Sequence, residues 1–284
     1  RLLRVTGAGT AGGANAVDVA CPAGCPWELS ELRDIEFAGA AGRVWATAFG
    51  GAARSDDFGA TWTVTSGGGG SSISVHPADS AQVYVAGGVG VAWTTDDGAN
   101  WSVSSSFPGN GAGLSALTTD VTYDPFDPDY QLAGTASNGV YRNTTPGGTA
   151  YTQQVLGMNA TNIRAVAAGP GNRLHAGVGD AFGATFASFL STDPASIVWG
   201  PGYTGLEADQ LRALEIDPND SDVVYGGGAF SPRSDGAGGF VNGNGGIYRS
   251  VDGGVSWSTR DNGIPLDAGF FDRSQFCTLR TFSI

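Results

Sequence analysis

Three octets of nearly identical sequence recur along the chain and constrain its fold more than any other feature. They occupy residues 55–62, 94–101 and 250–257 and read SDDFGATW, TTDDGANW and SVDGGVSW. Asp and Ser side chains hydrogen-bond backbone amides one or two residues further on, and Gly readily adopts positive φ, so each octet predicts a tight turn. The closing Trp predicts a large ring buried at the start of the following strand.

The octets form the ends of longer repeats. Prolines close the first strand of four repeats and lie 48, 45 and 48 residues apart, at Pro77, Pro125, Pro170 and Pro218. Two further repeats carry degenerate octets that still end in an aromatic ring, at Tyr151 and Trp199. A period of about 40–50 residues with four short strands in each unit is typical of propeller blades. We expect blades at 33–68, 69–113, 114–161, 162–210 and 211–268.

The octets resemble the Asp box, or BNR repeat, of sialidases, sortilin-type receptors and two-propeller xyloglucanases. This resemblance implies an all-β propeller of four-stranded antiparallel blades, about five to seven in number. It also implies that each octet lies between the third and fourth strands of a blade, away from the binding face, and has a structural role. The structural residues are then Ser55, Asp57, Gly59, Trp62, Asp96, Gly98, Trp101, Ser250, Asp252, Gly254 and Trp257.

The two ends of the chain lie outside the five repeats. Residues 1–32 form an N-terminal segment in which Cys21 and Cys25 are predicted to form a small disulfide, while Cys277 stands alone. Residues 269–284 read as the first strand of a further or ring-closing blade. Either the chain is a fragment of a longer protein, which the abrupt ending favours, or residues 2–6 supply the missing strand.

The charge balance excludes two classes of partner. The chain has 14 basic residues, all Arg, against 27 acidic residues, for a net charge of -13. Such a chain lacks the basic patch that nucleic acid or an anionic membrane surface needs. No apolar run approaches the ~18 residues of a membrane span. We expect an extracellular or cell-surface protein without a cofactor or a metal site, whose partner is a polysaccharide or an extracellular protein.

Loops opposite the octets usually hold the site of a propeller. The fifth repeat has an insertion at 229–245, where Arg233, Phe240 and Asn242 are the predicted contacts to a sugar or peptide, unless the insertion is only a flexible Gly-rich loop. A second long loop occupies residues 179–186. If the chain were an enzyme, the candidate acids would be Asp180 and Asp235, one on each loop.

The enzymes that the octets resemble need residues that this chain lacks. Sialidases carry an Arg-Ile-Pro motif, whereas the Ile-Pro here follows Gly263, and the chain has only five Glu. The two-propeller xyloglucanases cleave between two propellers with one catalytic Asp from each, and this chain has room for one propeller. The sequence therefore favours a non-catalytic binding module, with a glycoside hydrolase lacking its second propeller or a structural surface or filament protein as alternatives.

Overall fold

The protein is all-β in the part of the chain that the structure, a computed structural model, describes. The described residues are 3–6, 15–18, 32–39, 42–104, 107, 117–123, 129–143, 150–169, 173–179, 188–191, 196–206, 208, 210–229, 232–234, 240–242 and 246–260. Within them every regular element is a strand, and none is a helix long and apolar enough to cross a bilayer.

Five antiparallel sheets follow one another along the chain as blades 1 to 5. Blade 1 contains β3 (Leu32–Phe37), β4 (Val44–Ala48), β5 (Gly51–Ser55) and β6 (Thr63–Val64). Blade 2 contains β7 (Ser72–His76), β8 (Asp79–Ala86), β10 (Val91–Thr94) and β11 (Ser102–Ser104). Blade 3 contains β12 (Leu117–Tyr123), β13 (Gln131–Thr135), β14 (Gly139–Asn143) and β15 (Tyr151–Gln154), and gains β9 (Gly88–Val89) as a fifth strand.

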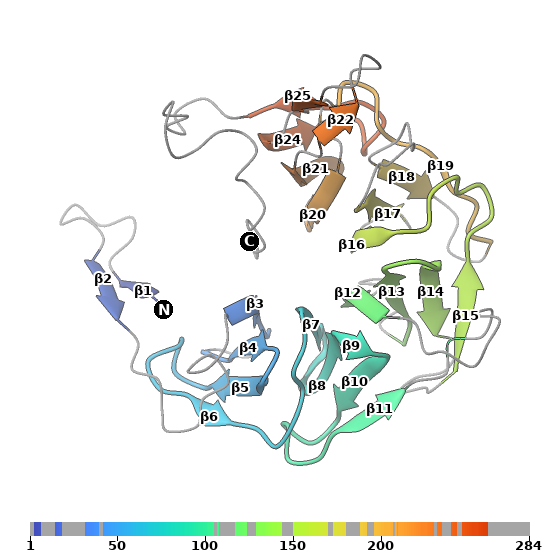
Figure 1. Ribbon diagram of the computed structural model, residues 1–284. Helices are drawn as coiled ribbons and strands as arrows, with labels where there is room; N and C mark the ends of the chain where they lie inside the picture. Colours follow the sequence, from blue (N-terminus) through green and yellow to red (C-terminus); the bar gives the residue numbers. More distant parts are fainter. Residues whose placement is uncertain are drawn as a thin grey trace.

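Blades 4 and 5 repeat the same order. Blade 4 contains β16 (Ile163–Gly169), β17 (Arg173–Val178), β18 (Ser188–Ser191) and β19 (Gly200–Pro201). Blade 5 contains β20 (Gln210–Asp217), β21 (Asp220–Ala229), β24 (Gly246–Ser250) and β25 (Ser258–Thr259). Figure 1 shows the five sheets arranged around a common axis with the first strand of each blade innermost, which is the arrangement of a β-propeller.

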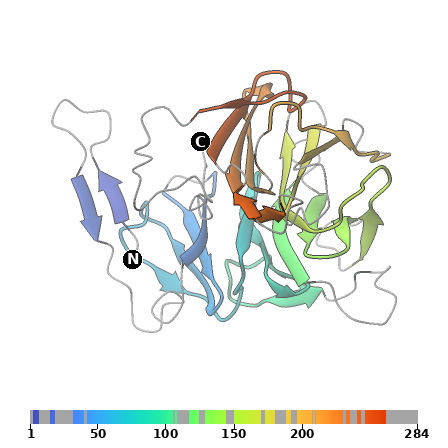
Figure 2. The same cartoon turned by 45° about the horizontal axis from the view of Figure 1, so that its top comes forward.

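Two short ribbons lie outside the blades. Strand β1 (Leu3–Thr6) pairs with β2 (Asn15–Asp18) and not with any blade sheet, and Figure 2 shows this hairpin set apart from the ring. Strands β22 (Pro232–Ser234) and β23 (Phe240–Asn242) pair within the insertion of blade 5. The insertion therefore contains a hydrogen-bonded ribbon, and residues 3–6 do not extend a blade.

The first strands of blades 1, 3, 4 and 5 share a β-bulge. The register of each with its second strand shifts at the same place, between Leu32 and Asp34 in blade 1 and between Leu211 and Ala213 in blade 5. The other two shifts lie between Thr118 and Asp120 and between Ile163 and Ala165. A bulge bends its strand and increases the local twist. It therefore changes which side chains of the inner strand turn toward the axis.

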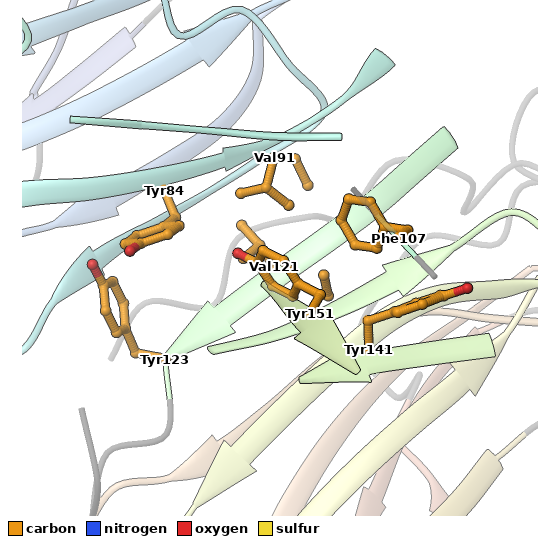
Figure 3. Packing of buried hydrophobic residues seen from close by; sticks show 9 residues of the cluster. Tyr84, Val91, Phe107, Val121, Tyr123, Tyr141 and Tyr151 are labelled. Carbon is orange, nitrogen blue, oxygen red and sulfur yellow. The ribbon is translucent and has the colours of Figure 1, made fainter. Parts of the chain in front are cut away.

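The hydrophobic core lies in the seams between blades, because alternate side chains of a strand face opposite neighbours. In blade 2, Val83 and Val85 belong to the cluster shared with blade 1, whereas Tyr84 and Ala86 belong to the cluster shared with blade 3. Figure 3 shows this second seam, which is filled mainly by aromatic rings. There the rings of Tyr84 and Tyr123 meet edge to face with centroids 5.3 Å apart.

Candidate functional site

A cavity of about 600 Å³ lies where the first strands converge. Its lining comes from β3, β7, β12, β16 and β20, together with Tyr225 and Gly227 of β21. Four of the lining residues are acidic, and they come from blades 1, 3 and 5: Asp34, Glu36, Asp120 and Glu215. The volume falls within the range of about 300–1,000 Å³ that is usual for ligand pockets. We therefore take this axial cavity as the candidate site.

Two of the acids hold neighbouring first strands together. The carboxylate of Asp34 accepts the N–H of Ile35 at 2.9 Å and the N–H of Ile73, in the next blade, at 3.0 Å. The carboxylate of Asp120 accepts the N–H of Val121 at 3.1 Å and that of Val166, again in the next blade, at 2.8 Å. Both oxygens of each carboxylate are engaged, so these two acids have a structural role in joining blades 1 to 2 and 3 to 4.

Blades 2 and 3 are joined in the same way by hydroxyl groups. The hydroxyl of Ser74 accepts the N–H of Tyr123 at 3.2 Å, and that of Ser72 lies 3.5 Å from the N–H nitrogen of Val121. Both serines are buried. A polar side chain on one inner strand thus satisfies a backbone N–H of the next one, which a buried peptide group requires.

The pKa values of both glutamates of the cavity are raised. Burial raises the pKa of the Glu36 carboxyl well above its usual range; the charges of the other three acids add to this, and an N–H bond from Val75 opposes it. Burial, with the charges of Asp120 and Asp34, raises the pKa of Glu215 to about 8. Glu215 is therefore mostly protonated at neutral pH and can donate a hydrogen bond or a proton.

The octets form closely similar hydrogen-bond networks between the third and fourth strands of blades 1, 2 and 5. In the first, the Ser55 hydroxyl donates to Asp57 at 2.8 Å and accepts the N–H of Gly59 at 2.8 Å. Asp57 then accepts the N–H and the hydroxyl of Thr61, both at 2.7 Å. These bonds, with the one from Ser55, lower the pKa of Asp57 to about 2. Its ionised carboxylate thus closes the turn.

The second and third octets repeat this pattern. Asp96 accepts the N–H and the side-chain amide of Asn100 at 2.9 and 2.7 Å, and Asp252 accepts the N–H of Ser256 at 2.8 Å. The fifth residue of each octet is a glycine with positive φ, at 79°, 80° and 86°. The fourth residue also has positive φ, which is unusual for Phe58 and Asp97. The octet thus needs two consecutive left-handed residues, and the sequence pattern points to only one of them.

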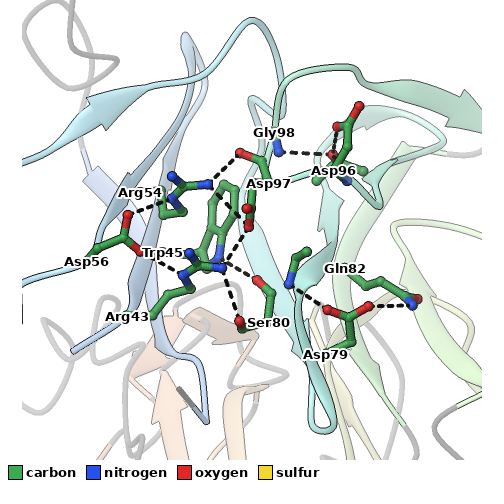
Figure 4. A network of polar contacts seen from close by, with 12 residues as sticks. Arg43, Trp45, Arg54, Asp56, Asp79, Ser80, Gln82, Asp96, Asp97 and Gly98 are labelled. Carbon is green, nitrogen blue, oxygen red and sulfur yellow. Dashed lines mark hydrogen bonds and ion pairs between the residues drawn. The ribbon is translucent and has the colours of Figure 1, made fainter. Parts of the chain in front are cut away.

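Two joints between blades combine an arginine with a ring two residues later. In the first, Arg43 bonds Asp56 of its own blade and Asp97 of blade 2, and the Trp45 ring packs against Gly98 (Figure 4). In the second, Arg173 bonds Asp222 of blade 5 at 2.5 Å and donates to the carbonyl of Asp252 at 3.5 Å. His175 then packs against Gly254. In both joints, the arginine and the ring contact the octet of the following blade.

The structure brings together only part of the set of residues predicted from the sequence. Arg233, Phe240 and Asn242 lie on the β22–β23 ribbon, in which Arg233 pairs with Val241 and Asn242 with Pro232. Asp180 and Asp235 lie outside the described residues, as do Cys21, Cys25, Cys277 and the tail at 269–284. Within the described residues, no group of three His, Cys, Asp or Glu side chains is placed to hold a metal ion.

The sequence contained a signal for the cavity that spacing alone does not reveal. Asp34, Ser72 and Asp120 each directly precede a β-branched apolar residue of an inner strand, at Ile35, Ile73 and Val121. Aligning the strands on that apolar residue would have placed all three at one position. Blades 4 and 5 have alanine there, at Ala165 and Ala213, so the signal covers three blades of five.

Comparison with known proteins identifies the fold. Neither a protein-family model nor a curated protein matches the chain. Among solved structures, the GH74 xyloglucanase from Xanthomonas campestris is similar with 19% identity and a TM-score of 0.61 over 87% of this chain and 42% of that one. The GH74 enzyme from Niastella koreensis is similar with 18% identity and a TM-score of 0.58, over 80% and 38%.

A second group of solved structures is closer to this chain in length. YCF48 from Cyanidioschyzon merolae shares 17% identity and a TM-score of 0.53, over 85% of this chain and 87% of that one. A structure of YCF48 bound to D1 peptide gives 17% identity and a TM-score of 0.51, over 85% and 84%. The chain thus spans about two fifths of the GH74 enzymes and most of YCF48, and at these identities the likeness establishes a β-propeller fold.

Proposed function

We propose that this chain is a non-catalytic, extracellular binding module of the Asp-box type, and that it binds a segment of a partner protein at the axial cavity. The observation that carries the proposal is the state of the cavity acids. Both oxygens of Asp34 and both oxygens of Asp120 accept backbone N–H bonds, so two of the four cavity acids are committed to a rigid scaffold.

A structural likeness supports a binding role. YCF48, which has been solved with a bound D1 peptide, is similar to this chain over most of both chains. A polysaccharide ligand is the alternative outcome, and the chemistry of the cavity favours a protein segment. Carboxyl groups partly withdrawn from water interact most favourably with cationic or hydrogen-bonding groups.

Glycoside hydrolysis is the second candidate, and one observation favours it. Glu215 is a buried carboxyl with a pKa raised to about 8, in the same cavity as Asp120 and Asp34, and a protonated acid facing a carboxylate is the pair that such hydrolysis uses. Against it, a carboxylate with both oxygens bonded to backbone N–H groups makes a poor nucleophile or base.

Binding is tested with peptide-display and glycan arrays on the purified chain. Thr122→Arg places a large side chain in the cavity lining, and Thr152→Arg adds the same side chain at an exposed position of strand β15. We expect selected peptides to bind the wild type and Thr152→Arg and to lose at least tenfold in affinity with Thr122→Arg. Equal affinity for both variants would place the ligand elsewhere, and glycan binding alone would replace the protein partner by a polysaccharide.

Catalysis is tested with the same protein. Xyloglucan, mixed-linkage β-glucans and sialyl-lactose are incubated with the chain, and reducing ends and free sialic acid are measured. We expect no turnover. Turnover that disappears in Glu215→Gln would overturn the proposal in favour of the hydrolase. Turnover lost in Asp180→Asn or Asp235→Asn would instead point to the two long loops.

A further inference from the structure

The seam between blades 4 and 5 contains a buried imidazole that no described residue hydrogen-bonds. His175, on β17, is fully buried, and neither of its ring nitrogens has a partner among the described residues. The ring lies directly against Gly254, where an added Cβ would meet the imidazole at 2.3 Å. A neutral ring can remain in such a place, whereas an imidazolium needs acceptors or water for both N–H groups.

The repeat supplies a matched comparison within the same molecule. Arg43 and Trp45 of blade 1 meet the octet of blade 2, and Arg173 and His175 of blade 4 meet the octet of blade 5. The two joints use an arginine, a ring two residues later and a glycine of the next octet. They differ in that only the second ring can take up a proton.

Among the described residues, no charged group around the seam hydrogen-bonds the His175 ring. The elements packed against His175 carry Arg164 on β16, Arg212, Glu215 and Asp217 on β20, and Asp252 in the octet, while the sequence of β18 has no charged residue. Burial lowers the pKa of His175 to about 3, and the charge of Arg173 contributes a smaller part of this shift. The Asp252 carboxylate is already bonded to Ser250 and Ser256.

We propose that the joint between blades 4 and 5 is an acid-sensitive latch, in which protonation of His175 releases the octet of blade 5 from strand β17. The proton is taken up by the opened joint, because there the ring reaches water. The joint between blades 1 and 2, with Trp45 at the equivalent place, stays closed under the same conditions.

The size of the effect follows from linkage. An exposed imidazole has a pKa of about 6.5, and the buried one titrates near 3, so acid favours the open joint over the whole interval between them. At pH 4.5 the opening equilibrium constant should exceed its value above pH 7 by about 100-fold. In this interval the joint is weakened as the pH falls, which is the sign expected for a base with a depressed pKa.

Hydrogen exchange of the whole chain tests the latch. Opening constants, corrected for the intrinsic pH dependence of exchange, are measured for amides 250–257 and for amides 94–101 at pH 7 and pH 4.5. We expect the rise only at 250–257, and His175→Phe, which keeps a ring but cannot be protonated, should abolish it. An equal rise in both octets, or the same rise in His175→Phe, would overturn the proposal.

A second measurement does not depend on any variant of His175. The chain has two histidines, and His76→Gln assigns the imidazole signals in the NMR spectrum. The signal of His175 in the closed form should stay that of a neutral ring down to pH 4.5. A closed-form signal that titrates near pH 6.5 would show that the seam accommodates the charge, and the latch would be excluded.

Discussion

Arg43 in blade 1 and Asp97 in blade 2 are joined by an ion pair of 2.7 Å between Nη1 and Oδ1. The same guanidinium bonds Asp56 at 2.7 Å and the Ser80 hydroxyl at 3.1 Å (Figure 4). Arg54 reaches Asp56 and Asp97 as well, both at 3.2 Å. A network of this kind is worth more than isolated surface pairs, because the side chains are already held in place.

Arg43→Ala should lower the free energy of unfolding by about 1 kcal/mol, because it removes the ion pairs of the first joint. The effect is small because the side chains of Asp56 and Asp97 are 52% and 41% exposed, so water partly screens their charges. Thermal unfolding with and without 1 M salt measures this loss of stability. The loss should shrink at high salt, where ion pairs are screened. Arg260→Ala, which removes an arginine without an ion pair among the described residues, is the control and should change little. Equal effects of the two variants would contradict the prediction.

Ser250→Ala should destabilise the third octet. The buried hydroxyl donates to Asp252 and accepts the N–H groups of Asp252 and Gly254, so its removal leaves a buried donor unpaired. The expected loss is about 1–3 kcal/mol in the free energy of unfolding. Ser258→Ala, on the exposed part of β25, should stay within about 0.5 kcal/mol. A Ser250→Ala variant that unfolds at the wild-type temperature would show that the octet network is dispensable.

The regular part of this fold could be predicted from the sequence because its signals are local. A turn such as 55–62 is specified by eight consecutive residues. The period of the repeats then predicted four-stranded antiparallel sheets in a propeller, and the structure confirms this fold class.

The axial cavity could not be predicted in the same way, because it depends on residues from different blades. Asp34 and Glu215 are 181 positions apart in the chain, and only the arrangement of the blades around a common axis brings them into one cavity. The bulges at the start of β3 and β20 also change which residues face the axis, and no residue type announces a bulge. The burial of His175 could not be predicted from the sequence for a related reason, since Gly254, against which its ring packs, belongs to another blade.

Tyr123→Phe should leave the free energy of unfolding unchanged or raise it by up to about 1 kcal/mol. The hydroxyl is buried in the seam between blades 2 and 3 and has no hydrogen-bond partner among the described residues, so its removal ends a desolvation cost (Figure 3). Thr135→Val is the control, because it removes a buried hydroxyl that donates to the Gly139 carbonyl at 2.8 Å, and it should destabilise. A Tyr123→Phe variant less stable by more than about 1 kcal/mol would indicate an ordered water on the hydroxyl.

The last prediction concerns the pH dependence of stability that Glu215 confers. The pKa of this carboxyl is raised from 4.5 to about 8 in the folded chain, so at intermediate pH the unfolded chain has lost a proton that the folded chain keeps. The contribution of Glu215 to stability is therefore complete below pH 4.5 and is lost as the pH rises to about 8, by up to about 1.4 kcal/mol per pH unit. Chemical unfolding between pH 5 and 8 measures the slope. Glu215→Gln, which is neutral at every pH, should make the slope shallower, and Glu36, whose pKa is also raised by burial, should account for the slope that remains. An unchanged slope in Glu215→Gln would show that Glu215 does not contribute. Asp120→Asn removes one of the charges that raise the pKa of Glu215 and should move the midpoint of the loss to lower pH. His175 acts in the opposite direction below pH 6.5, so His175→Phe combined with Glu215→Gln separates the two contributions.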